Sequence, residues 1–161
     1  MDLGRTERLV RLYDGKGLLD RVDGDARVGA AQRIALARDD LDGVRLLIDG
    51  GSYRLAFNAA YDTLRHAAEA VLRGAGSRVT SALGGHEAVF ALADALVAGY
   101  SDGVFAGARA GSSRLKRNSL EYPEDNPVTV DELDAREVLQ WASDAINAAD
   151  SFLSRQPLPT I

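Results

Sequence analysis

The residues best suited to chemistry lie close together between positions 114 and 122. Arg114, Lys116 and Arg117 supply three cations, and Asn118 and Tyr122 add an amide and a phenol. A guanidinium holds phosphate through paired, charge-assisted hydrogen bonds, and a lysine adds a point charge. The pattern therefore indicates contact with a phosphate group, with Arg117 and Tyr122 as candidate catalytic residues and Arg114, Lys116 and Asn118 as candidate phosphate-binding residues.

Each of these residues also has a structural interpretation. Arg117 precedes Pro123 at an expected helix end, where a cation interacts with the last carbonyl groups and the helix dipole. Tyr122 can be a half-buried aromatic residue with its hydroxyl in water. His66 is expected to form a surface ion pair with Asp62, four residues earlier on the same helix, and His86 is expected to begin a helix.

The net charge of the chain limits how it can bind nucleic acid. With a net charge of -5 and a pI near 5.0, it is not expected to coat nucleic acid by general electrostatics. The stretch from Gly103 to Leu120 contains no acidic residue and collects the basic ones. Any contact with phosphate is therefore expected to be local.

Other familiar chemistries do not fit the sequence. The chain has no cysteine, so it cannot form disulfides or thiolate metal sites. His86-Glu87 begins like a zinc-protease helix, but Phe90 stands where the second histidine is required, and no phosphate-binding loop with a Gly-Lys-Ser/Thr ending is present. We expect no metal and no cofactor. No segment has the long apolar run of a membrane span, and a cytoplasmic location is expected.

Hydrophobic spacing predicts a helical protein without a sheet. Residues 1–25 read as a short helical lead followed by a loop, and residues 26–156 read as one bundle. Its helices are expected at 26–49, 53–73, 86–98, 104–120 and about 129–155, followed by a tail at 157–161. The second of these, with large apolar side chains on one arc and alanines beside them, is expected to be central. The fold class is an all-α antiparallel bundle of about five helices.

The last helix carries the clearest start signal. Thr129 and Glu132 have the spacing of a capping box, and Val128 and Leu133 have that of a hydrophobic staple. This pattern predicts a helix that begins just after Thr129.

The order of these segments resembles the HEPN superfamily over residues 26–155. The resemblance rests on the alanine-rich YDTLRHAAEAVL segment, the GHEAVF segment, Arg117-Asn118 at a helix end and the final long helix. HEPN proteins carry an arginine followed four to six residues later by histidine. Here the start of the motif matches, and Tyr122 stands at the histidine position.

This resemblance implies a homodimer associated with RNA or a nucleotide, of prokaryotic toxin-antitoxin or defence type. In active members the motif cleaves RNA without a metal, so Arg117 would hold the phosphate, Tyr122 or an imported group would move protons, and Asn118 would fix the geometry. The resemblance also implies a nucleotidyltransferase-type antitoxin as partner. Tyrosine has an ordinary pKa of about 10, which makes it a poor general base. The alternative hypothesis is therefore a non-catalytic dimeric binding or assembly module that acts through a partner protein.

Overall fold

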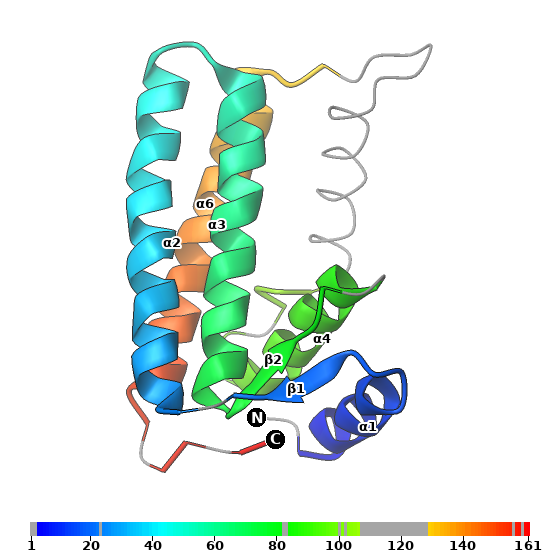
Figure 1. The fold of residues 1–161 in the computed structure, drawn as a ribbon. Helices are drawn as coiled ribbons and strands as arrows, with labels where there is room; N and C mark the ends of the chain where they lie inside the picture. The colour runs from blue at the N-terminus through cyan, green and yellow to red at the C-terminus, as the bar shows by residue number, and fades with distance from the viewer. Residues whose placement is uncertain are drawn as a thin grey trace.

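A computed structural model gives the structure of the chain and describes residues 3–22, 24–81, 84–99, 101, 103–106, 129–155, 157–158 and 160–161. Helices dominate this part of the chain, as the hydrophobic spacing predicts, and one small two-stranded sheet accompanies them (Figure 1). The elements are α1 (Leu3–Asp14), β1 (Leu19–Arg21), α2 (Ala26–Asp49), α3 (Tyr53–Gly74), β2 (Ser77–Val79), α4 (Gly85–Val97) and α6 (Glu132–Leu153).

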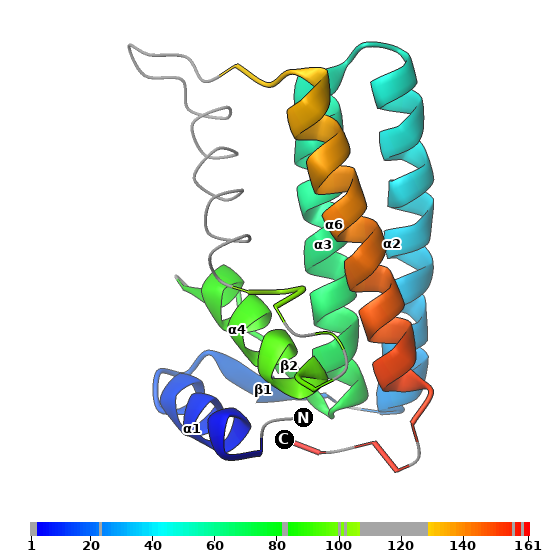
Figure 2. The same ribbon diagram turned by 180° about the vertical axis from the view of Figure 1, so that it is seen from behind.

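The three longest helices, α2, α3 and α6, pack side by side along most of their lengths (Figures 1 and 2). α3 is central because it also packs against α4 and β2. Its sequence explains this position: small residues such as Ala56, Ala60 and Ala67 are fully buried and allow close approach of neighbouring helices. At its end, a Cβ on Gly74 would lie 2.4 Å from Leu153 Cδ2, so glycine lets α6 pack closely against this turn.

The core extends through the bundle in two clusters. The larger one includes an edge-to-face aromatic pair, Tyr61 and Phe90, whose ring centroids lie 5.8 Å apart at an interplanar angle of 70°. The smaller cluster includes Val44, Phe57 and Val138 from α2, α3 and α6. None of the helices that the structure describes is both long enough and apolar enough to cross a membrane.

The short elements gather at one end of the bundle. α1, α4 and the sheet lie there, and so do both ends of the chain (Figure 1). β1 pairs with β2 antiparallel, with Leu19 opposite Val79 and Arg21 opposite Ser77. The expectation of a loop without strands is therefore wrong at residues 19–21. Strands this short leave no alternation to detect, and their partners are distant in sequence.

The start of α6 also differs from the sequence prediction. The N-cap is Asp131, whose carboxylate accepts from the Asp134 N–H at 2.9 Å, while the Asp134 carboxylate accepts from the Asp131 N–H at 3.2 Å. Asp131 and Asp134, not Thr129 and Glu132, therefore form the capping box. Leu133 is 76% exposed, and Val128 lies outside the described residues.

Candidate anion-binding groove

The residues that the sequence singles out for chemistry are not among those described. Arg114, Lys116, Arg117, Asn118 and Tyr122 all lie in the stretch 107–128, outside the described residues. Their roles remain predictions. The described part of the chain nevertheless contains a groove with related chemistry, whose residues the sequence interpretation assigned to structural roles.

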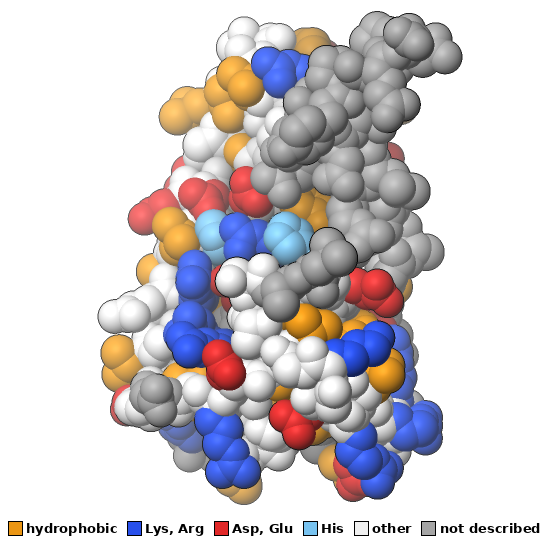
Figure 3. All heavy atoms as spheres, turned by 45° about the vertical axis from the view of Figure 1, so that its right-hand side comes forward, with side chains coloured by type: hydrophobic (Ala, Val, Ile, Leu, Met, Phe, Trp, Pro, Cys, Tyr) orange, Lys and Arg blue, Asp and Glu red, His pale blue; other side chains and the backbone are white. Residues whose placement is uncertain are grey.

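This groove lies where α3, the end of β2 and the start of α4 meet. We call it the Arg65 cavity; it has a volume of about 270 Å³. Its lining residues are Arg65, Glu69, Val79, Thr80, Ser81, Gly85, His86 and Val89. Figure 3 shows histidine side chains, pale blue, on either side of a basic side chain on this face, with further basic side chains gathered nearby. Residues with a guanidinium, an imidazole, two hydroxyl groups and one carboxylate, that of Glu69, therefore line one cavity.

Arg65 is held by a network of polar contacts along α3. Its Nη1 donates to Glu69 Oε1, its Nη2 lies 3.2 Å from His66 Nε2, and its Nε lies 3.6 Å from Asp62 Oδ1. The side chain is only 24% exposed. The contacts at Nη1 and Nη2 hold the guanidinium, while Nε is buried without a hydrogen-bond partner, so binding an anion here requires little further ordering of the side chain.

His66 contacts both Arg65 and the neighbouring helix α2. Its Nδ1 lies 2.8 Å from Asp40 Oδ2 on α2, and its side chain is 12% exposed. The expected ion pair with Asp62 is therefore wrong, because Asp62 contacts Arg65 and the imidazole turns toward the neighbouring helix. A guanidinium can only donate, so His66 Nε2 must accept from Arg65, and His66 Nδ1 must carry the proton that faces Asp40. In this tautomer both ring nitrogens are engaged.

His86 reaches the cavity from the first turn of α4, and a close approach of two backbones sets its position. A Cβ on Gly85 would lie 2.7 Å from the Thr80 carbonyl oxygen, so α4 can start this near the end of β2 only with glycine. Gly84, the N-cap, has φ of 93°, a conformation that L side chains rarely adopt. His86, an exposed side chain, thereby lines the same cavity as Arg65, at a helix start as the sequence predicts.

A second cavity of about 80 Å³ adjoins the first, because Glu69 and Val79 line both. We call it the Arg73 cavity. Its other lining residues are Arg33, Leu72, Arg73 and Arg78. In an acidic protein, four arginines thus line two adjoining cavities, and one described glutamate lies between them.

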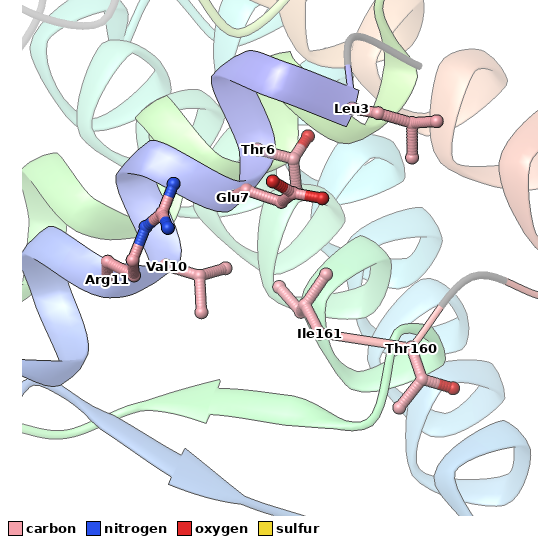
Figure 4. Close-up of a pocket in the computed structure, with 7 residues that line it drawn as sticks. All are labelled: Leu3, Thr6, Glu7, Val10, Arg11, Thr160 and Ile161. Atoms are coloured by element: carbon pink, nitrogen blue, oxygen red, sulfur yellow. The ribbon is translucent and has the colours of Figure 1, made fainter.

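A further cavity, of about 310 Å³, lies between α1 and the C-terminal residues (Figure 4). Its lining includes the aliphatic side chains of Leu3, Val10 and Ile161, with Glu7 and Arg11 beside them. It is the larger space, but none of its lining residues supplies an imidazole beside the Arg11 guanidinium.

The sequence held a weak signal for the groove. Arg65, His66 and Glu69 follow one another at helical spacing on the polar arc of α3, but this pattern is equally typical of a solvated face with local ion pairs. The groove differs from a solvated helix face because His86 and Thr80, from later segments, also line it. Comparisons of the chain with protein-family models, curated proteins and solved structures found no match.

Proposed function

We propose that this chain is a HEPN-like protein of prokaryotic toxin-antitoxin or defence type that binds RNA or a nucleotide. In this proposal the Arg65 cavity and the motif from Arg117 to Tyr122 act on the same ligand. The observation that carries the proposal is the fixed Arg65 guanidinium on the wall of a cavity that is also lined by His86.

The physical support is preorganisation. A guanidinium with fixed orientation presents donors that match the oxygen atoms of a phosphodiester, and partial burial strengthens the attraction. Ser81 adds a neutral hydroxyl residue to the cavity lining, whereas the Thr80 hydroxyl donates to the Gly17 carbonyl oxygen at 3.4 Å. Such a set favours an anionic ligand with several oxygen atoms over a purely apolar one.

The reaction open to such a site is metal-independent cleavage of RNA. The ribose 2′-oxygen forms a bond to the adjacent phosphorus, the bond from phosphorus to the 5′-oxygen breaks, and a 2′,3′-cyclic phosphate results. One group takes the proton from the 2′-hydroxyl, and another gives a proton to the departing 5′-oxygen. Imidazole is the side chain suited to such transfers near neutral pH, so His86 is a candidate partner for Tyr122. Arg117 and Arg65 would stabilise charge on the phosphate.

One observation favours the alternative, a non-catalytic binding or assembly module. Both ring nitrogens of His66 are occupied, one by Asp40 and one by Arg65, so this histidine acts as a support and not as a proton carrier. With tyrosine at position 122, the site then depends on His86 for an imidazole. In the alternative, the groove binds its ligand, and any chemistry belongs to a partner such as a nucleotidyltransferase-type antitoxin.

The deciding experiment is incubation of the purified protein with mixed RNA in EDTA. Wild type is compared with Arg117→Ala, Tyr122→Phe, Arg65→Gln and His86→Gln, and with Arg54→Gln as a matched control on the exposed part of α3. Cleavage by wild type and the control, lost in the other variants, would support the enzyme. RNA binding without cleavage would support the binding module. Neither binding nor cleavage by wild type would overturn the proposed function.

A further inference from the structure

The Arg73 cavity combines three guanidinium groups from three elements. Arg33 comes from α2, Arg73 from the last turn of α3, and Arg78 from β2. Such a convergence is costly without a counter-charge, because like charges in a small space repel one another. The described carboxylates near these three groups show how much of the charge is already balanced.

Two of the three arginines have partners. Arg33 Nε lies 3.3 Å from Glu69 Oε2, and Arg78 Nη2 lies 3.1 Å from Asp20 Oδ2. Within the described part of the chain, Arg73 has no carboxylate at ion-pair distance. Its position in the last turn of α3 gives it a favourable interaction with the helix dipole. That interaction accounts for a cation here, but it does not use the hydrogen-bonding fork of the guanidinium.

The Arg73 guanidinium lies close to the backbone of α2. A Cβ on Gly29 of α2 would lie 3.5 Å from Arg73 Nη1. The guanidinium therefore lies along the α2 backbone at a glycine and stays partly covered, at the wall of the cavity. An arginine that makes no ion pair with a described carboxylate keeps its five N–H donors available to a ligand.

We propose that the Arg73 cavity is a second phosphate subsite for the ligand of the Arg65 cavity. The inference rests on the proposed function for its ligand class. Because Glu69 and Val79 line both cavities, the ligand would carry at least two phosphate groups, as an RNA strand or a 5′-phosphorylated end does. A phosphate entering the Arg73 cavity binds Arg73 and competes with Glu69 for Arg33.

The first test uses pyrophosphate alone and does not depend on RNA. Pyrophosphate is titrated into the ¹⁵N-labelled full chain while the arginine Nε–Hε signals are followed. The Arg73 signal is expected to shift, and Arg73→Gln should weaken binding about tenfold, as the loss of a bidentate contact does. Arg54→Gln makes the same charge change elsewhere on α3 and should bind like wild type. No shift at Arg73, or equal weakening in both variants, would overturn the subsite.

The second test separates the two phosphates. Hexauridylate with and without a 5′-phosphate is bound to wild type, Arg73→Gln and Arg73→Lys over a range of salt concentrations. Arg73→Gln should lower the slope of log affinity against log salt by about one phosphate contact, and Arg73→Lys should restore the slope but not the full affinity. An Arg73→Gln slope equal to that of wild type would remove the subsite while leaving the proposed function intact. If wild type binds pyrophosphate at Arg73 but binds no RNA, the phosphate subsite stands and the proposed function is overturned.

Discussion

His66 Nδ1 on α3 lies 2.8 Å from Asp40 Oδ2 on α2, and this contact joins the two helices next to Arg65. Its effect extends beyond the pair, because His66 Nε2 accepts from Arg65, which in turn binds Glu69. A chain of polar contacts therefore runs from one helix to the other and sets the direction of a guanidinium.

The first prediction concerns this series of polar contacts. Asp40→Asn should cost about 1 to 2 kcal/mol of unfolding free energy, because a partly buried histidine loses its charged acceptor. It should also let the His66 ring adopt either neutral tautomer. Long-range ¹⁵N spectra of His66 should then change from protonation at Nδ1 to a mixture of protonation at Nδ1 and Nε2. Asp39→Asn, on the exposed side of α2, is the control. Equal stability of both variants with an unchanged tautomer would show that Asp40 does not orient the ring.

A second prediction tests the junction that places His86. Gly85→Ala puts a Cβ 2.7 Å from a backbone carbonyl oxygen and should destabilise the protein by about 1 to 3 kcal/mol, the usual range for an enforced backbone shift. At Gly43, in the middle of α2, a Cβ would meet nothing within 4 Å. Gly43→Ala should therefore stabilise by up to about 1 kcal/mol. Urea denaturation of both variants gives the comparison, and a Gly85→Ala protein as stable as wild type would contradict the close approach.

The third prediction asks whether the cavity and the sequence motif act on one ligand. If they do, RNA affinity in Arg65→Gln, Arg117→Ala and the double variant should be non-additive by about 0.5 kcal/mol or more. Circular dichroism checks that all three remain folded. Strictly additive losses would mean that Arg65 and Arg117 serve independent sites.

A fourth prediction concerns pH and the start of α6. A side-chain hydrogen bond from Arg136, helped by one from Tyr53, lowers the pKa of Glu132. The charge of Glu132, with burial and the hydrogen bond between them, raises the pKa of Tyr53. The Glu132 contribution is therefore present above the ordinary carboxyl pKa and is lost as pH falls through the lowered value. The Tyr53 contribution is present below the ordinary phenol pKa and is lost as pH rises through the raised value.

Denaturation of wild type, Glu132→Gln and Tyr53→Phe across pH checks this. The difference between wild type and Glu132→Gln should shrink in acid, below the ordinary carboxyl pKa of about 4.3. The Tyr53→Phe difference should shrink in alkali, above about 10. Differences that stay constant with pH would show that neither group titrates differently in the folded protein.

The described helices were predictable because their signals are local. The helix expected at 104–120 lies mostly outside the described residues, and residues 104–106 are not helical. The apolar stripe of α2 and the glycines at 50 and 51 set its bounds, and the alanine arc of α3 predicted its central place. The capping box of α6 was misplaced because Thr129 and Asp131 are both good N-cap residues, and spacing alone does not decide between them. The strand at 19–21 was missed because its partner is Ser77–Val79, far along the chain.

The groove was hidden for a related reason. Arg65 and His66 have neighbours of opposite charge at helical spacing, which suffices to explain them on an isolated helix. Only the fold shows that His66 contacts Asp40 on another helix and that His86 lines the same cavity as Arg65. The motif from Arg117 to Tyr122 remains a sequence prediction, since it lies outside the described residues.

The central position of α3 has a consequence for how the protein opens. A helix that packs against α2, α4, α6 and β2 cannot unfold locally without disturbing all of them. In hydrogen–deuterium exchange, the amides in the middle of α3 should therefore be the last to exchange, while those of α1 exchange early. The wall that carries Arg65 would then belong to the slowest-exchanging part of the molecule.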